Sequence, residues 1–151
     1  MIAGLLFYRY SAAILVLATQ LLVTIPVQVL KRTLQEDRPK LFFEKLNIPL
    51  PQIEGVAMHS TNSFPSGHTA AAFALFFCLS IIVKNPFVKL LFFILALGVA
   101  FSRVYLSQHF ASDVLVGSIV GVFFTYIYAM YHQRIRNTWF DKSLILKRNN
   151  L

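Results

Sequence analysis

The residues best suited to chemistry lie between the last two apolar stretches of the chain, where His109 and Asp113 are four residues apart. On a helix, this spacing puts both side chains on one face, one turn apart. A carboxylate that accepts a proton from one imidazole nitrogen leaves the other nitrogen with a free lone pair. The pair therefore has the composition of a nucleophile and the group that orients it.

Three cations lie at the ends of apolar stretches, and their chemistry matches an anion. Arg38 and Arg103 each offer a planar fork of donors that fits an edge of a phosphate, and Lys31 adds a compact positive charge. Together they predict a cradle for a tetrahedral dianion.

A short motif, Pro65-Ser66-Gly67-His68, opens the second apolar stretch. Gly67 allows close approach of the backbone, Ser66 adds a hydroxyl donor, and the free N–H groups at a helix start attract anions. His68 is suited to protonate a leaving oxygen and then to activate water. No carboxylate cluster or His/Cys set suits a metal ion, so we expect no metal and no cofactor.

Each of these residues also has a plainer interpretation. Lys31 could be an ordinary flank at a membrane interface, and a histidine at a helix end is often a satisfied interface residue. Asp113 could cap a helix or pair with Arg103 for structure. An acid just inside an apolar run is costly, however, and is usually functional.

Four apolar runs must position these residues, in a chain of 151 residues that is 57% hydrophobic and 13% charged. The runs are residues 11–30, 64–83, 87–101 and 110–131, the third reaching Tyr105 if Lys89 snorkels. About 20 apolar residues in a helix cross the hydrocarbon layer. We therefore predict an all-α integral membrane helical bundle with four membrane-spanning helices; the alternative is a soluble bundle with fully buried helices.

Four crossings bring the candidate residues to one face of the membrane, because the first and third helices end where the second and fourth begin. The residues expected in this common layer are Lys31, Arg38, Ser66, His68, Arg103, His109 and Asp113. Lysine and arginine are somewhat more frequent on the other side, which holds both termini and the 84–89 turn. The positive-inside rule places that side in the cytoplasm and the candidate residues outside.

Nothing in the sequence divides the chain, so we expect a single membrane-embedded domain over residues 1–151. Residues 132–151 form its basic cytoplasmic tail, which is either an amphipathic segment on an anionic leaflet or a solvated tail. The one cysteine, Cys78, excludes a disulfide within the chain.

Together these residues resemble the type-2 phosphatidic acid phosphatase family, membrane lipid phosphatases related to glucose-6-phosphatase and the vanadium haloperoxidases. The family shows three motifs, K-x-x-x-x-x-x-R-P, P-S-G-H and S-R-x-x-x-x-x-H-x-x-x-D. The chain matches them at Lys31 with Arg38-Pro39, at residues 65–68, and at Ser102-Arg103 with His109 and Asp113.

The resemblance implies a role for each matched residue. Lys31, Arg38 and Arg103 would bind the phosphate, helped by Ser66 and the backbone N–H of Gly67. His109 would attack phosphorus to give a phosphohistidine, Asp113 would orient His109, and His68 would be the general acid, with no metal ion needed.

In one respect the chain departs from the pattern of this family. Membrane members of the family usually have six membrane helices, with the first motif after the third helix, whereas here that motif follows the first apolar run. We therefore expect the family core without two N-terminal helices, and homo-oligomerisation is left open.

The expected partners are the bilayer and a lipid phosphate or pyrophosphate, with no nucleic acid. Candidate substrates are phosphatidic acid, phosphatidylglycerol phosphate, undecaprenyl pyrophosphate and lipid A phosphates, at a site that faces the periplasm or exterior of a bacterial inner membrane. Three alternatives compete: phosphoryl transfer to another lipid through the same histidine, binding or transport without chemistry, and a silent scaffold. Transport would favour a site near the bilayer midplane, whereas these residues lie at helix ends.

Overall fold

The structure, a computed structural model, describes residues 10–50 and 58–135, and all regular secondary structure in these two ranges is helical. The helices are α2 (Tyr10–Leu34), α3 (Pro39–Lys45), α4 (Gly67–Ile82), α5 (Pro86–Tyr105) and α6 (Ala111–Ile135). The prediction of an all-α fold is confirmed.

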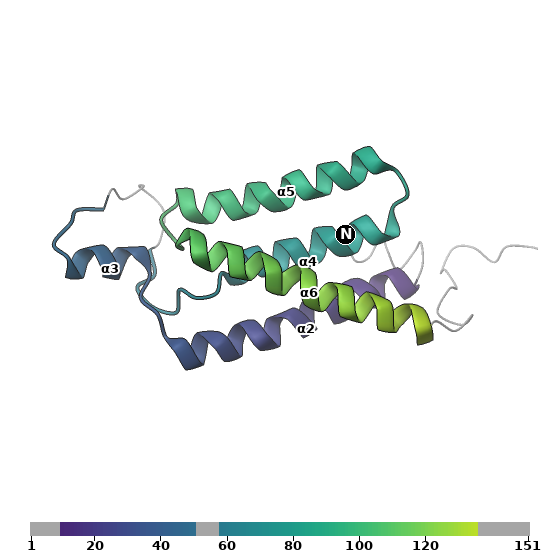
Figure 1. Ribbon diagram of the computed structural model, residues 1–151, viewed down its shortest axis with the longest axis horizontal. Helices are drawn as coiled ribbons and strands as arrows, with labels where there is room; N and C mark the ends of the chain where they lie inside the picture. Colours follow the sequence, from purple (N-terminus) through teal and green to yellow (C-terminus); the bar gives the residue numbers. More distant parts are fainter. Residues whose placement is uncertain (1–9, 51–57, 136–151) are drawn as a thin grey trace, which may run out of the picture.

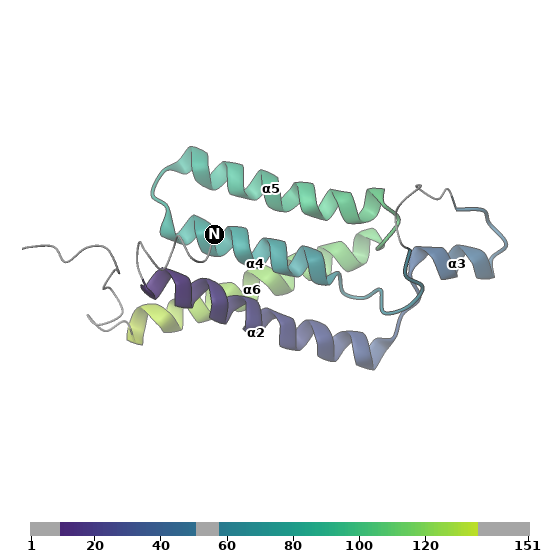
Figure 2. The ribbon, with the colours of Figure 1, turned by 180° about the vertical axis from the view of Figure 1, so that it is seen from behind.

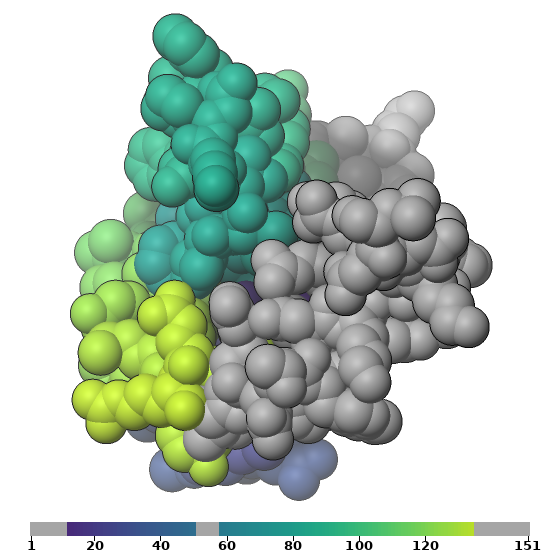
Figure 3. Space-filling view, turned by 90° about the vertical axis from the view of Figure 1, so that its right-hand side faces the viewer, coloured from purple at the N-terminus to yellow at the C-terminus, as the bar shows by residue number. Residues whose placement is uncertain are grey.

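The four long helices run side by side, and the short α3 projects beyond one end of the bundle (Figures 1 and 2). The central helix is α4, which packs against α2, α5 and α6, while α2 and α6 also contact each other. The fourth long helix, α5, lies on the outside of the bundle and packs mainly on α4. Viewed from the end opposite α3, the teal atoms of α4 and α5 lie above the yellow-green end of α6 (Figure 3).

The lengths and compositions of the helices suit an integral membrane protein. Three segments, Ala12–Lys45, Pro86–Tyr105 and Ala111–Arg134, are long and apolar enough to cross a membrane. Their apolar side chains point largely outward. On α5, for example, Phe87 is 78% exposed and Phe101 is 69% exposed, as expected for a helix whose outer surface lies against lipid.

The central helix α4 is shorter than the apolar run in the sequence, because the first residues of that run precede the helix and one of them caps it. The apolar run begins at Phe64, yet the helix begins only at Gly67, after Pro65 and the N-cap Ser66. With 16 residues, α4 is about 24 Å long, less than the roughly 30 Å of a hydrocarbon layer. Ser63, Pro65 and Ser66, just before α4, are fully buried, so this motif lies inside the bundle.

Small residues allow α6 to approach α4 closely. A Cβ atom at Gly117 would lie 2.6 Å from the carbonyl oxygen of Ser66, and one at Gly121 would collide with the carbonyl oxygen of Ala70. Gly117 and Gly121 form a G-x-x-x-G pair, which is a common contact motif between membrane helices. The close approach sets the N-terminal turn of α6 against the N-terminal turn of α4.

The remaining core is apolar and lies in two clusters along the bundle. One joins Val23 and Val27 of α2 to Ala70 and Ala74 of α4. The other, nearer the opposite end, consists of Leu15, Val16, Cys78 and Ala129. Cys78 is a free cysteine that is buried in this cluster.

The end of α6 extends into the predicted basic tail. The helix continues to Ile135, so residues 132–135 are helical and His132 is buried. Residues 136–151 lie outside the described part of the chain, and the extent of the single domain stays a prediction.

Candidate active site

The segments that carry the three motifs meet at the end of the bundle near α3 (Figure 1). The ammonium group of Lys31, on α2, donates to the carbonyl oxygen of Asn62 at 2.6 Å. At the other edge of the same loop, the backbone N–H of Ser66 donates to the carbonyl oxygen of Asp113 at 2.9 Å. The loop before α4 is thus bonded to both α2 and α6.

Arg38 completes the connection between the first and third motifs. Its Nη1 donates to the side-chain oxygen of Gln108 at 3.0 Å and to the Gln108 carbonyl oxygen at 3.3 Å. Its Nε donates to the carbonyl oxygen of Thr61 at 3.0 Å. The guanidinium is therefore held in one orientation from two sides, and Pro39, which follows it, starts α3 as the first helical residue.

The turn after α5 positions His109 by its backbone hydrogen bonds. Ser107, in a left-handed conformation with φ of 51°, donates its N–H to the carbonyl oxygen of Val104, and Gln108 donates to that of Arg103. These two bonds form the Schellman pattern that ends many helices. His109 N–H also donates to the Arg103 carbonyl oxygen, at 3.3 Å, so the chain turns back directly from Arg103 to His109.

Asp113 lies at the centre of the site and is fully buried. Its Oδ2 accepts hydrogen bonds from the Ser63 hydroxyl, from the Phe110 backbone N–H at 2.9 Å, and from Nδ1 of His109 at 3.4 Å. Asp113 therefore both caps the start of α6 and contacts His109. Its Oδ1 has no hydrogen-bond partner among the described residues.

His109 is only 3% exposed, and its surroundings set its charge. Burial lowers the pKa of His109 below the ordinary value, and the charges of Arg38 and Lys31 lower this pKa further, while the hydrogen bond to Asp113 raises it. The lowering effects win, so His109 is neutral at pH 7. With Nδ1 directed to Asp113, Nε2 is the nitrogen with the free lone pair.

The start of α4 presents Gly67 and His68 but uses Ser66 internally. The Ser66 hydroxyl accepts from the Thr69 backbone N–H at 3.4 Å and lies 2.9 Å from the Thr69 hydroxyl. Ser66 is thus a buried N-cap, and its direct contact with a phosphate stays a prediction. Next to it, Gly67 faces Lys31, since a Cβ on Gly67 would lie 3.7 Å from Cε of Lys31.

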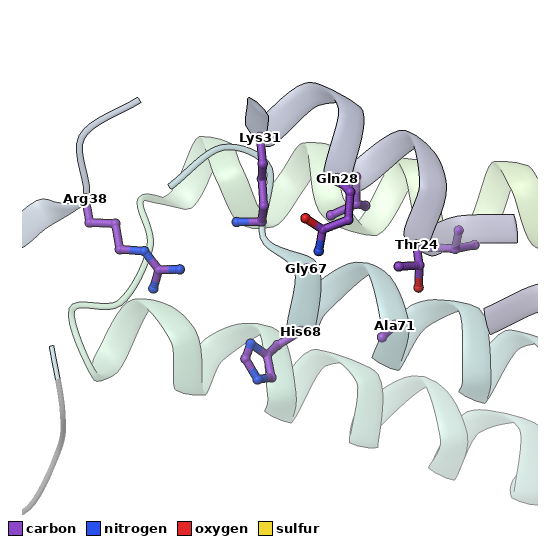
Figure 4. A pocket seen from close by; sticks show the side chains of 9 residues that line it. Thr24, Gln28, Lys31, Arg38, Gly67, His68 and Ala71 are labelled. Carbon is purple, nitrogen blue, oxygen red and sulfur yellow. The ribbon is translucent and has the colours of Figure 1, made fainter. Parts of the chain in front are cut away.

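Four of the predicted residues border one open cavity of about 320 Å³: Lys31, Arg38, Gly67 and His68. Figure 4 shows Lys31 and His68 on opposite sides of this space, with Arg38 at its outer edge. Arg103 does not border the cavity, but it lies within electrostatic reach of His68, as does His109. Its Nε donates to the Ser102 hydroxyl at 3.2 Å.

The described part of the chain contains no group of three or more His, Cys, Asp or Glu side chains placed to hold a metal ion. The cationic side chains predicted to bind an anion are those of Lys31, Arg38 and Arg103. Their surroundings also help to hold them, because Lys31 and Arg38 donate to backbone carbonyls of residues 61–63.

Several contributing residues were not predicted from the sequence. Ser63 bonds to Asp113 and Gln108 bonds to Arg38, although neither belongs to a motif. The serine stands three residues before Ser66, and no pattern in the sequence identifies its partner. Gly117 could have been recognised from its G-x-x-x-G spacing with Gly121.

Comparisons with known proteins agree with this geometry. Over 65 residues, the chain is 40% identical to a lipid A 1-phosphatase of Porphyromonas gingivalis. The matched stretch covers 42% of this chain and only 15% of that protein. A crystal structure of Aquifex aeolicus LpxE superimposes with a TM-score of 0.72 at 27% identity, covering 86% of this chain and 74% of the other.

The family comparison covers all of the described structure. The model of the PAP2 superfamily matches residues 10–137, a range that includes all three motifs and the four long helices. This confirms the resemblance on which the sequence interpretation depends. The chain belongs to the PAP2 superfamily.

Proposed function

We propose that this chain is a membrane phosphatase that hydrolyses a phosphate monoester or pyrophosphate of a lipid at the outer membrane face, through a phosphohistidine at His109. The observation that supports it most is the buried His109, which contacts Asp113 and does not itself border the cavity. It lies within electrostatic reach of Lys31, Arg38 and His68, which do border the cavity. A nucleophile, its orienting carboxylate, an acid and two cations thus lie together at one end of the bundle.

The first step transfers the phosphoryl group to the protein. The phosphate binds between Lys31, Arg38 and Arg103, whose charges offset its own. Nε2 of His109 attacks phosphorus as the bond from phosphorus to the lipid oxygen breaks, and protonated His68 gives its proton to that oxygen. The ring of His109 becomes positive, and Asp113 stabilises it.

The second step returns the protein to its starting state. His68, now neutral, removes a proton from water as the water oxygen attacks phosphorus and the phosphorus–nitrogen bond of His109 breaks. Inorganic phosphate leaves, His109 is neutral again and His68 is protonated. The cations within electrostatic reach of His68 disfavour its protonated form in the empty site, and a bound dianion offsets them.

The charge distribution and the homologues support the membrane assignment. Lysine and arginine favour a cytoplasmic position for the termini, which leaves the cavity outside, at the level where lipid phosphates lie. For a bacterial protein this is the inner membrane, with the site facing the periplasm or exterior. Similarity to a lipid A 1-phosphatase supports a lipid phosphate as the substrate class.

The test is phosphate release from a panel of lipid phosphates by the protein in detergent with a chelator present. His109→Ala should reduce release below detection, whereas the control His59→Ala, at an exposed histidine outside the motifs, should not. Quenching in base after a short reaction with phosphorus-labelled substrate should trap labelled protein in the wild type but not in His109→Ala.

Three results would contradict the proposal. Activity in His109→Ala would remove the nucleophile assignment, and inhibition by the chelator would overturn the expectation that no metal is needed. A wild-type protein that releases phosphate from no lipid phosphate would exclude the hydrolase itself.

A further inference from the structure

The cavity beside the cationic residues continues as a groove between α2 and α4, away from the bundle end. Val23 and Val27 of α2 and Ala71 of α4 form its apolar walls, while Thr24 and Gln28 of α2 add polar groups. Figure 4 shows Gln28 and Thr24 in line with Lys31 along α2, across from His68 and Ala71. The groove is therefore amphipathic and is continuous with the phosphate end of the site.

The two polar side chains occur at defined depths below Lys31. Gln28 precedes Lys31 by three residues and Thr24 precedes it by seven, which corresponds to about 4.5 and 10 Å along the helix axis. Because Thr24 and Gln28 are four residues apart, they lie on one face of α2. A group bound to them would thus belong to the part of a substrate directly next to its phosphate.

The hydrogen-bonding state of these side chains leaves both available to a ligand. The Thr24 hydroxyl donates to the carbonyl oxygen of Gln20 at 2.7 Å, so its oxygen can still accept. Gln28 makes no hydrogen bond to another described residue, in contrast to Gln20, whose amide donates to the Ala71 carbonyl oxygen at 3.1 Å. The side chains of Thr24 and Gln28 are both exposed at the open cavity, so a ligand in the groove can reach the hydrogen-bonding groups that they leave unused.

We propose, building on the proposed function, that this groove binds the alcohol part of a lipid phosphate that carries hydroxyl or amide groups within about 5–10 Å of phosphorus. Gln28 and Thr24 recognise these groups, and the valine walls contact the hydrocarbon that follows. An N-acylated sugar phosphate and an N-acylated amino-alcohol phosphate share this chemistry. A polyprenyl phosphate or a diacylglycerol phosphate has no hydroxyl or amide group at this distance from phosphorus.

A matched pair of substrates tests the inference. Ceramide 1-phosphate has an amide N–H and a hydroxyl near its phosphate, and phosphatidic acid of equal chain lengths has only esters there. The wild type should favour ceramide 1-phosphate in kcat/KM by roughly three- to tenfold for each hydrogen bond. Gln28→Leu and Thr24→Val should each lower this ratio by a similar factor, mainly through KM.

The control is Thr33→Val, which makes the same change on α2 at a residue outside the groove whose hydroxyl bonds only to Val29 of its own helix. It should keep the wild-type ratio. Because a ratio of two substrates does not depend on the amount of folded protein, partial misfolding of a variant cannot imitate the effect.

The outcomes separate this inference from the proposed function. If the wild type hydrolyses both lipids equally well, or if Gln28→Leu keeps the wild-type ratio, the groove assignment is wrong and the phosphatase remains. If Gln28→Leu instead changes only the oligomeric state, α2 contacts another chain there, and the assignment is equally wrong. If the wild type hydrolyses no lipid phosphate, the proposed function itself fails.

Discussion

The two ends of the bundle bury polar groups in different ways. Near α3, hydrogen bonds connect separate segments: Ser63 bonds to Asp113, and Arg38 bonds to Gln108. Farther along the bundle, most side-chain hydrogen bonds stay within one helix, as when the Thr125 hydroxyl donates to the carbonyl oxygen of Gly121 at 2.6 Å. Hydrogen bonds between segments therefore concentrate where side chains must be held in a fixed arrangement.

The apolar end is held mainly by packing between helices. Around Leu15, Val16, Cys78 and Ala129, close contact between helices supplies the stability, because lipid tails are as apolar as the side chains that they would replace. A defect at this end should therefore cost stability without changing the chemistry, whereas a defect near α3 should change both. The following variants test this difference.

The largest effect is expected for Asp113→Asn. The amide cannot hold the Nδ1 proton of His109 as the carboxylate does, and loss of such an orienting carboxylate lowers kcat by roughly 10²- to 10⁴-fold. The control is Asp37→Asn, because Asp37 pairs with Lys45 at the surface and should keep nearly full activity.

The pH profile of the same variant provides a second measurement. Protonation of His109 removes the nucleophile, and its pKa is already below the ordinary value, so wild-type activity should persist below pH ~6.5 and fall at lower pH. Asp113 raises this pKa, so Asp113→Asn should move the acid limb to still lower pH. A limb that moves upward would contradict the contact between the two residues.

A smaller loss is expected for Ser63→Ala. This change removes a hydrogen bond to a buried carboxylate, which is worth about 1.5–3 kcal/mol, and kcat should fall by roughly 10- to 100-fold with little change in KM. Ser63→Thr should restore most activity. As a control, Ser118→Ala removes a hydroxyl that bonds only to its own helix, and an equal loss there would exclude a specific role for Ser63.

Gly117→Ala tests the close approach of α6 to α4. Its Cβ would lie 2.6 Å from the Ser66 carbonyl oxygen, so the helices must separate, at a cost of about 1–3 kcal/mol. Thermal unfolding in detergent and phosphate release should both decline. At Gly98 a Cβ would meet no atom within 4 Å, so Gly98→Ala should slightly stabilise the protein, and a loss of similar size in both variants would contradict the packing argument.

The smallest effect on activity is expected for Val16→Ala, at the apolar end. Val16 is 1% exposed, and its truncation leaves a cavity that costs about 1–2 kcal/mol of stability. The unfolding temperature should drop, while kcat and KM measured well below that temperature stay at wild-type values. A changed KM would show that the two ends are not independent.

The sequence was sufficient for the fold class because helices in a membrane satisfy their own backbone groups, so long apolar runs predict them directly. It was also sufficient to bring the motifs to one end, since four antiparallel crossings allow only that arrangement. The boundaries were less accurate. The apolar run from Phe64 does not show that the helix begins at Gly67, because the local cap of Ser66 decides where the first turn starts.

By itself, the sequence determined the family, the helices and the chemical types of the site residues, because these depend on composition and on spacing along the chain. Only the tertiary structure decided which groups touch: that Ser63 bonds to Asp113, that Gln108 holds Arg38, and that Gln28 faces the groove. The physical reason is that such contacts join residues up to 70 positions apart. Their geometry depends on how closely the helices pack, and that distance depends on small residues such as Gly117.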